Sequence, residues 1–412
     1  MKINLILFSA ELNDNPANFK SPRPLFEGLR AFYDINTIPS SDYISYLERF
    51  PPQAGDEKLT VAFIASGGTE DTFLTLFPFL KQPVIILSDG YNNSFAAACE
   101  ICTWLENNNI EHISIHVPLE AGRLYFEELS GLLKKMYHHI LIKQTLKGEK
   151  IGLLGGSSSW LIASHISRSE VEERYGVSFT DIKITEFTEL YENIRGSGKD
   201  FRQDPLFMEY RAFLTDGRTE TDLADALAAY YALDKICSKY GLNAVTIKCF
   251  DIISLCRVTV CLAAAILNDR GIVAGCEGDI PAVITLLILH KGGRRGFMVN
   301  PASADREKLT VDFAHCTVPF SMTESFRLSS HFESSMSIGI KGRLPLGRYS
   351  IVKFSGKNLE RHYHCSGSII SIPDVPVRCR TQVKFRFDTS EDFEMFMAGR
   401  FGNHVVLFKG NI

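Results

Sequence analysis

The sequence predicts an α/β protein in which two doubly wound units precede an antiparallel β-domain. Strand-like and helix-like segments alternate through most of the chain, as in parallel sheets covered by helices. After about residue 304, short alternating runs between Gly and Pro turns favour antiparallel strands. A chain of 412 residues also exceeds the size at which one hydrophobic core normally stops growing. We therefore expect three domains, at residues 1–146, 147–303 and 304–412.

The expected first domain alternates strands and helices in the order of a parallel, doubly wound sheet. Apolar and β-branched runs predict strands at residues 3–8, 59–65, 83–87 and 113–116. Helical periodicity predicts helices near residues 24–32, 69–80, 94–107 and 120–137. The apolar N-terminal run superficially resembles a signal peptide, but Asn4 interrupts it and Glu11 follows it, so a first strand fits better.

A second alternating series leads to a short polar turn and then to the β-domain. Strands are predicted at residues 150–156, 182–185, 244–251 and 271–274, and helices at residues 219–240, 252–267 and 281–289. The β-domain is expected to hold strands at residues 309–314, 325–333, 349–355, 362–372, 382–387 and 404–408. Its last strand could fold back over the turn that ends the second domain.

Composition excludes several classes of function. A net charge of −4 and an isoelectric point near 6.3 provide no basic surface for nucleic acid or for an anionic membrane. The longest apolar region, residues 252–267, contains Arg257 and is shorter than the ~20 residues of a membrane span. The ten cysteines lack the spacing of a disulfide framework or a paired-cysteine zinc site, which indicates reduced thiols in a cytoplasmic protein.

One carboxylate, that of Glu277, is the best clue to function. It lies in a Gly-Cys-Glu-Gly-Asp-Ile-Pro turn between a predicted strand and an apolar helix that Asp279 could cap. Ligands of open α/β sheets bind outside the carboxyl ends of the strands, so Glu277 is well placed for a metal ion or a substrate. The alternative is an acid that complements the helix dipole. His404, close to the end of the chain, is its expected partner.

Two Gly-rich turns could line a binding cleft. One contains Gly67 and Gly68 and the other runs from Gly155 to Ser157, and each follows a predicted strand and is expected to open a helix. Their backbone N–H groups could hold an anion. Neither turn has the spacing of a dinucleotide or P-loop fingerprint, which favours tight strand-to-helix turns at the wall of a cleft.

Several short motifs share their order along the chain with one enzyme superfamily. They are the turns at Gly67 and Gly155, the run around Lys248, the Glu277 turn, the strands that carry Asn300 and His315, and the Gly-Asn-His sequence that ends at His404. This ordered set resembles the L-fucose isomerase and L-arabinose isomerase superfamily over nearly the whole chain. The resemblance implies two Rossmann-like domains, a C-terminal antiparallel β-barrel domain and an aldose–ketose isomerase activity.

The resemblance also implies a site. The metal ligands would be Glu277, His404 and Asn300. The catalytic residues would be Glu277, Asn300 and His315. In part of the family, the residue that matches His315 is a second histidine ligand. The sugar-contacting positions would be Asn403, Lys248, Gly67, Gly68 and Ser157. The cofactor would be a divalent metal ion, with Mn²⁺ expected. The enzyme would be a homo-oligomer, trimer or hexamer, with active sites shared between subunits.

The chain departs from the family at the second acidic ligand. Val299 stands where the family has that acid, and Asn300 follows it. Since alternate residues of a strand face opposite ways, only one of the two can face the metal, and only Asn300 offers an oxygen. Other acids that could substitute are Asp279, Asp305 and Asp312, but each fits better as a helix cap, a loop acid or an exposed strand residue.

The expected function is a metal-dependent ketol isomerase acting on a monosaccharide or a sugar derivative through an enediolate. Two alternatives remain open: a non-catalytic sugar- or metal-binding protein of the same fold, and an epimerase on the same scaffold. His331 and the pair His362 and His364 could also approach a site in the β-domain, although their alternation is more typical of a half-exposed strand face.

Overall fold

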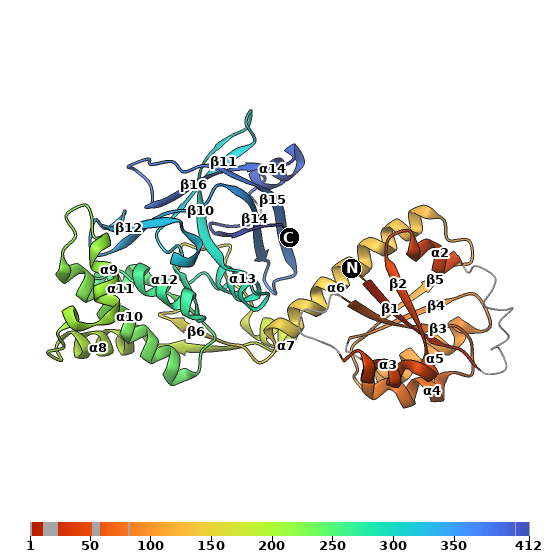
Figure 1. The fold of residues 1–412 in the computed structure, drawn as a ribbon. Coiled ribbons are helices and arrows are strands. Elements are labelled where there is room, and N and C mark those ends of the chain that lie inside the picture. The colour runs from red at the N-terminus through yellow and green to blue at the C-terminus, as the bar shows by residue number, and fades with distance from the viewer. Residues whose placement is uncertain (1, 11–23, 52–57, 81–82, 400, 412) are drawn as a thin grey trace. The chain divides into compact units, whose positions relative to one another are not determined.

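The chain folds into an α/β structure with two parallel sheets and a closed antiparallel barrel (Figure 1). The computed structural model describes residues 2–10, 24–51, 58–80, 83–399 and 401–411. Two compact units are present, residues 1–142 and residues 143–412. The predicted fold class is therefore confirmed. No helix within the described ranges is long and apolar enough to cross a membrane.

The first unit contains a five-stranded parallel sheet in the order β2-β1-β3-β4-β5. The strands are β1 (Lys2–Phe8), β2 (Asp34–Pro39), β3 (Lys58–Ile64), β4 (Val84–Asp89) and β5 (His112–Val117). The helices are α2 (Pro24–Arg30), α3 (Tyr43–Arg49), α4 (Glu70–Leu76), α5 (Ser94–Asn107) and α6 (Arg123–Leu146), with short 3₁₀ turns η2 (Ser40–Asp42) and η3 (Phe77–Phe79).

Helices cover both faces of this sheet, as the alternating sequence predicts. One hydrophobic cluster joins the sheet to α2 and α6, and a second joins it to α3, α4 and α5. The edge strand β2 and helix α3 were not expected, because half of the short run Asp34–Pro39 is polar and only Ile38 in it is buried. A short polar edge strand carries little of the hydrophobic signal on which sequence prediction depends.

The second unit begins with a four-stranded parallel sheet in the order β7-β6-β8-β9. Its strands are β6 (Lys150–Leu154), β7 (Ser178–Ile182), β8 (Ala244–Ile247) and β9 (Val273–Cys276). The helices are α7 (Arg168–Tyr175), α8 (Ile184–Arg195), α9 (Pro205–Tyr210), α10 (Glu220–Tyr240), α11 (Cys249–Cys256), α12 (Cys261–Arg270) and α13 (Ile280–Lys291), with 3₁₀ turns η4 (Phe201–Gln203) and η5 (Arg211–Phe213).

Three local predictions in this unit are wrong. The apolar run at residues 252–267 is two helices, because Arg257 adopts a left-handed conformation with φ of 55° and ends α11. The turn at Gly155 opens into an irregular segment, and the next helix begins only at Arg168. The strand predicted at residues 182–185 lies earlier, at Ser178–Ile182, and helix α8 follows directly.

The antiparallel part is a closed barrel in the order β10-β11-β16-β15-β14-β17. Its strands are β10 (Gly296–Asp305), β11 (Thr310–His315), β14 (Gly347–Ser355), β15 (Arg361–Ser371), β16 (Thr381–Phe387) and β17 (Val405–Lys409). A separate pair, β12 (Ser325–Ser329) and β13 (Gly339–Arg343), a 3₁₀ turn η6 (Phe320–Met322) and helix α14 (Ser390–Met397) accompany it. The barrel implied by the family resemblance is present.

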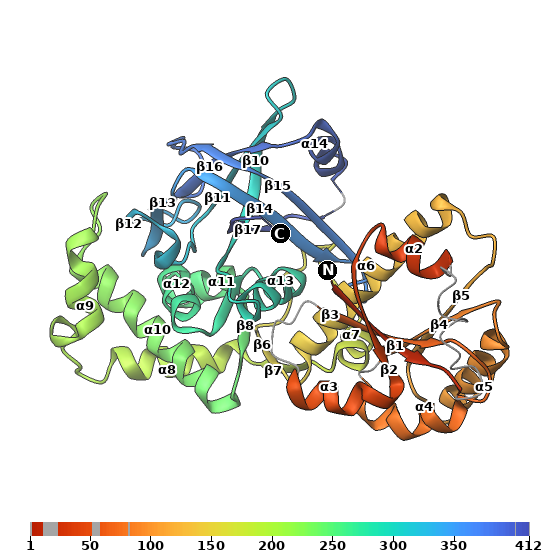
Figure 2. The same cartoon turned by 45° about the vertical axis from the view of Figure 1, so that its right-hand side comes forward.

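Helix α13 joins the second sheet to the barrel. It contacts β8 and β9 on one side and β10, β14 and β17 on the other, and Figure 2 shows it beside these barrel strands. Its residues from Ile280 to Leu287 are all buried, as expected for a helix that is apolar around its whole circumference. The turn that precedes α13 is thereby held between the sheet and the barrel.

Gly278 makes this turn possible. Its φ is +67°, a conformation that side chains disfavour. A Cβ at this position would lie 2.6 Å from the Gly156 carbonyl oxygen and 2.8 Å from the backbone at Ser157 and Ser158. The turn before α13 and the turn after β6 therefore touch through their backbones.

We expect Gly278→Ala to destabilise the protein strongly, because the new methyl group meets backbone atoms that cannot move aside. Gly241→Ala is the matched control, since Gly241 has φ of +62° and open space around its Cβ position. Gly241→Ala should lower the free energy of unfolding by about 1–2 kcal/mol, because of its backbone conformation alone. Gly278→Ala should lower the melting temperature at least twice as far in calorimetry. Equal shifts for the two variants would contradict the close approach.

Candidate metal centre

Glu277 projects from a strained turn at the carboxyl end of β9. Its φ is +61°, and the Gly278 amide donates to the Ile247 carbonyl at the end of the neighbouring strand β8. Asp279 then caps α13, accepting a hydrogen bond from the Ala282 amide at 2.9 Å. A non-glycine residue in this conformation is uncommon and occurs often at functional sites. The predicted position and cap are both confirmed.

Three adjacent barrel strands bring the other polar groups to the same place. In the β17-β10-β11 order, Val299 pairs with Val405, and Asn300 pairs with Ala314. His404 directly precedes β17, and His315 ends β11. Asn300, His315 and His404 therefore occupy neighbouring positions at one end of the barrel, although more than 100 residues separate the first from the last.

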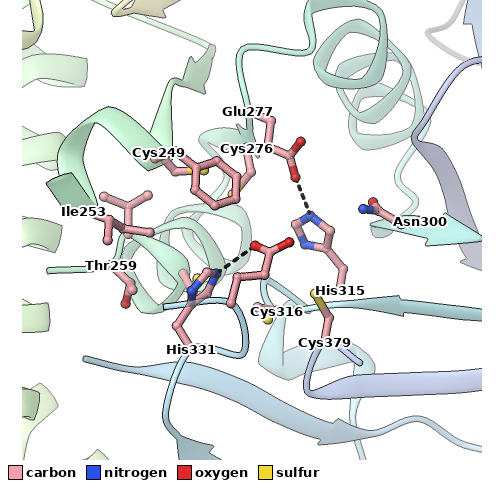
Figure 3. A pocket seen from close by; sticks show the side chains of 14 residues that line it. Cys249, Ile253, Thr259, Cys276, Glu277, Asn300, His315, Cys316, His331 and Cys379 are labelled. Atoms are coloured by element: carbon pink, nitrogen blue, oxygen red, sulfur yellow. Dashed lines mark ion pairs between the residues drawn. The ribbon is translucent and has the colours of Figure 1, made fainter. Parts of the chain in front are cut away.

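Glu277, His315 and His404 form a group that could hold a metal ion. One ligand atom from each lies within 4.8 Å of the others. Glu277 Oε1 is 3.4 Å from His404 Nε2 and 4.0 Å from His315 Nε2, the second distance being marked in Figure 3. The two imidazole rings meet edge to face, with centroids 5.7 Å apart. Within the described part of the chain, this is the one such group.

A buried chain of polar contacts orients His404. Its Nδ1 lies 2.9 Å from Asp279 Oδ2, and both Asp279 oxygens lie 3.3 Å from the Lys353 ammonium on β14. These three side chains are at most 1% exposed. In the neutral His404 ring, which is the form that binds a metal ion, Nδ1–H donates to the carboxylate and the Nε2 lone pair faces Glu277. Carboxylates behind ligating histidines fix the ring and its tautomer in this way.

The charges in the centre support ionised carboxylates. Burial alone would raise the pKa of Glu277, but the hydrogen bond and charge of His404, and the charge of His315, lower it below its ordinary value. Burial opposes ionisation of Asp279 as well, yet the Lys353 ammonium and His404 hold its pKa far below the usual range. The same two carboxylates raise the pKa of His404, against its burial. Both acids are therefore negative at neutral pH.

His315 is held as a neutral imidazole. Burial lowers its pKa to about 3, with a further contribution from His404. Its Nδ1 lies 2.9 Å from Thr317 Oγ1, so donation to that hydroxyl leaves the Nε2 lone pair facing Glu277. A neutral imidazole with a fixed tautomer is the form that binds metal ions.

Glu277 and His315 line a small pocket with about 20 Å³ of free volume (Figure 3). This volume is enough for one ion or one water molecule. Five cysteines line the pocket. Burial raises the pKa of Cys261, and a hydrogen bond with Cys249 together with burial raises the pKa of Cys276. These two thiols are therefore protonated at neutral pH, which makes them poorer metal ligands than the imidazole and carboxylate groups.

Asn300 also lines this pocket, whereas Val299 is fully buried in the barrel core. The Asn300 Oδ1 atom is buried and has no hydrogen-bond partner. An unpaired buried oxygen normally costs free energy, so its presence beside the Glu277 group suggests a partner that binds there. The strand alternation argument therefore selected the residue that does face the pocket.

The other acids considered as a second ligand have different partners. Asp279 caps α13 and contacts His404 and Lys353. Asp312 forms ion pairs with Arg378 and Lys384, and Asp305 pairs with Lys308. The Asp279 cap predicted from the sequence is present, whereas Asp305 ends strand β10 and Asp312 is buried in its ion pairs instead of exposed on the strand face.

The predicted sugar-contacting residues have varied surroundings. Asn403 Nδ2 lies 3.5 Å from His404 Nε2, and Ser157 lies against the Glu277 turn through Gly278. Lys248 directly follows β8, at the N-cap position of α11, and pairs with Asp251 at 3.0 Å. Gly67 and Gly68 belong to the first unit, where their turn opens α4 as expected.

Several residues of the centre were not anticipated. Trp160 donates its indole N–H to Glu277 Oε2 at 3.4 Å from the irregular segment after β6. Lys353 reads in the sequence as a polar residue of an alternating strand, yet it is buried. His331 lines the pocket together with Glu333, although the sequence favoured a half-exposed position for it. These contacts join segments that are distant in the sequence, so no local pattern marks them.

Comparison with known proteins gives a partial similarity to a sugar isomerase. A segment of 89 residues is 29% identical to a sulfoquinovose isomerase from Clostridium sp. (strain MSTE9). The match covers 21% of this chain and 20% of that protein, so it extends over only a fifth of the relative's length. No protein-family model matches the chain. The similarity is distant, and it accompanies a buried Glu/His/His group that could bind metal.

We expect Asp279→Asn to weaken binding of a divalent ion about 10–100-fold, because His404 loses the carboxylate that fixes its ring. The variant also leaves the Lys353 ammonium buried without its counter-charge, which destabilises the fold. The double variant Asp279→Asn/Lys353→Met removes that charge. Calorimetric titration with MnCl₂ should show that the double variant recovers stability without recovering affinity. Affinity restored together with stability would contradict the orienting role.

The buried histidines predict an acid-sensitive fold in the metal-free protein. Burial lowers the pKa of His315 to about 3 and of His331 to about 4, whereas an unfolded histidine has a pKa of about 6.5. Below pH 6.5 the unfolded chain therefore binds more protons, and stability falls as pH falls. The pKa of His404 is raised, so it is protonated in both states there and adds no slope.

The free energy of unfolding should thus decrease by about 2 kcal/mol between pH 6 and pH 5. Denaturant titrations with a chelator present measure this slope. His315→Gln should reduce the slope by about half, while His165→Gln, at an exposed position, should leave it unchanged. A His315→Gln slope equal to that of the parent protein would show that His315 is charged in the folded state.

Proposed function

We propose that this protein is a metal-dependent ketol isomerase that interconverts an aldose and a ketose, acting on a monosaccharide or a sugar derivative. The Glu277, His315 and His404 group at the junction of sheet and barrel is the observation that carries the proposal. The partial similarity to a sulfoquinovose isomerase supports the same class of reaction. The order of the sequence motifs supports it independently.

The residues fit a divalent ion. Glu277 supplies a carboxylate oxygen, and both histidines present Nε2 lone pairs that Asp279 and Thr317 orient. The unpaired Asn300 oxygen faces the same pocket. Mixed carboxylate and imidazole ligation suits Mn²⁺, although the ligand types also accept Co²⁺, Ni²⁺ or Zn²⁺. Mn²⁺ is the ion that we propose.

A bound divalent ion would polarise the carbonyl and hydroxyl oxygens of an open-chain sugar. Glu277, His315 and His404 would hold it, and Asn300 would add an amide oxygen or contact the sugar. The protonated thiols of Cys261 and Cys276 form part of the pocket wall. Trp160 donates to the second Glu277 oxygen, which favours one orientation of the carboxylate.

Counting charges suggests which sugars suit the centre. Glu277 with neutral His315, His404 and Asn300 leaves a divalent ion with a net charge of +1. An ion with this excess charge is the stronger Lewis acid and favours a ligand that brings negative charge. Sugars with an anionic substituent are therefore included among the substrates that we propose. Asn403, Lys248 and Ser157, with Gly67 and Gly68, are the proposed sugar contacts, in a homo-oligomer that shares sites between subunits.

The proposal is tested with purified protein supplied with Mn²⁺ and a panel of L-fucose, L-arabinose and sulfoquinovose. We expect bound metal and conversion of at least one sugar to its ketose. Glu277→Gln should lose most metal binding and all turnover without loss of the fold, because the only carboxylate ligand of the group is neutralised. His404→Asn should show the same defect, and Glu324→Gln, at an exposed position, serves as the control.

Metal stoichiometry that is unchanged in Glu277→Gln would remove Glu277 from the ligand set. Sugar binding without turnover in the parent protein would indicate the non-catalytic binding protein instead. Inversion at one carbon without formation of a ketose would indicate an epimerase. Mass spectrometry and polarimetry of the products separate these outcomes.

A further inference from the structure

Resting on the proposed function, we infer that Glu333 is a catalytic residue that carries the proton between C2 and C1 of the sugar. The ligand group provides one carboxylate, Glu277, and that carboxylate is occupied by His404 and Trp160. A second carboxylate, that of Glu333, lines the same pocket from a loop of the β-domain. Neither the sequence motifs nor the family resemblance assigns it a role.

The carboxylates of Glu277 and Glu333 differ in their exposure to solvent. The side chains of Glu277, His315 and His404 are 12%, 6% and 0% exposed, whereas that of Glu333 is 49% exposed. The ligands therefore lie at the inner end of the pocket and Glu333 lies toward solvent. The pocket itself has room for one ion, so a substrate that directs its oxygens at the inner group extends its carbon chain outward, on the side of Glu333.

The loop that carries Glu333 is built around His331. The His331 amide donates to the Met336 carbonyl at 3.0 Å, and the Ser335 amide donates back to the His331 carbonyl at 2.9 Å. The Ser334 amide donates to His331 Nδ1 at 3.3 Å. Thr259 hydrogen-bonds Ile338 at the far end of this loop. These contacts fix the backbone of the loop on both sides of Glu333.

The protonated ring nitrogen of His331 faces the Glu333 carboxylate. Because Nδ1 accepts from the Ser334 amide, the neutral ring carries its proton on Nε2, which lies 3.8 Å from Glu333 Oε2 (Figure 3). Within the described residues, no hydrogen bond is made to the Glu333 carboxylate. A carboxylate that has no fixed donor is free to accept a proton from a substrate, whereas Glu277 is not.

The electrostatic surroundings of Glu333 also favour its role as a general base. Burial and the negative charge of Glu277 raise the pKa of Glu333, which brings it closer to neutral pH and strengthens it as a proton acceptor. The same negative charge of Glu277 repels Glu333 and disfavours a direct approach of the two acids. A bound cation would reduce this repulsion but would leave the placement of Glu333 unchanged.

The proton transfer from C2 to C1 needs no other reactant. The Glu333 carboxylate takes the proton from C2 of the open-chain aldose, and the C–H electron pair becomes the C1–C2 double bond. The carbonyl π pair moves to O1, which gives an enediolate. Protonated Glu333 then returns the proton to C1, the O2–H proton moves to O1, and the ketose forms. No oxidant, reductant or second substrate is consumed.

The test compares Glu333→Gln with Glu333→Asp and with Glu324→Gln. Glu324 is an exposed acid of the same segment and is placed outside the centre. Measurements are the Mn²⁺ affinity by calorimetric titration, and kcat and KM for whichever panel sugar the parent enzyme converts. We expect Glu333→Gln to lose about 100-fold or more in kcat, with Mn²⁺ affinity and KM within about threefold of the parent. Glu333→Asp should recover part of the rate, and Glu324→Gln should match the parent.

Two results would overturn the role of Glu333 while leaving the isomerase in place. They are a kcat for Glu333→Gln equal to that of the parent, and a loss of Mn²⁺ affinity that would make Glu333 a ligand. A parent protein that binds Mn²⁺ but converts no panel sugar would overturn both proposals together. The activity of the parent therefore separates the two kinds of failure.

Discussion

The ion pair between Asp279 and Lys353 is the interaction on which the centre depends. Both groups are almost completely buried, so neither can be ionised without the other at an acceptable free energy. Asp279 belongs to the cap of α13 and Lys353 to barrel strand β14, and the pair therefore fixes the sheet-to-barrel junction. His404 completes the chain of contacts, so the position of a candidate ligand follows from a structural contact.

Asp279 thus has three structural roles at once. Asp279 accepts the Ala282 amide as a helix cap, neutralises Lys353 and holds the His404 ring. A carboxylate has enough acceptor sites for all three donors, which explains why an amide would not serve. Conversely, Glu277 next to it contacts Trp160 and the two histidines, so its partners belong to the candidate metal centre itself. Glu277 and Asp279 are two residues apart, but their different partners make the first a candidate metal ligand and the second a structural group.

Sequence patterns predicted the features that depend on neighbouring residues. The strand, turn, cap and apolar helix around Glu277 follow from local composition, and the structure contains each of them. The run at residues 252–267 was wrongly predicted as one helix because hydrophobicity continues across Arg257, where the backbone turns left-handed. The resemblance to known isomerases, with strand alternation, selected Asn300 over Val299 for the pocket-facing position.

The sequence by itself determined the α/β alternation, the antiparallel C-terminal part and the place of Glu277 at the end of a strand, because these depend on periodicity and turn chemistry within about ten residues. Only the tertiary structure decided that Lys353 is buried against Asp279 and that Glu333 shares a pocket with Glu277. Such contacts arise from barrel closure and from the docking of α13 against it. Their energies depend on burial and distance between remote segments, and neither quantity is encoded in any local run of residues.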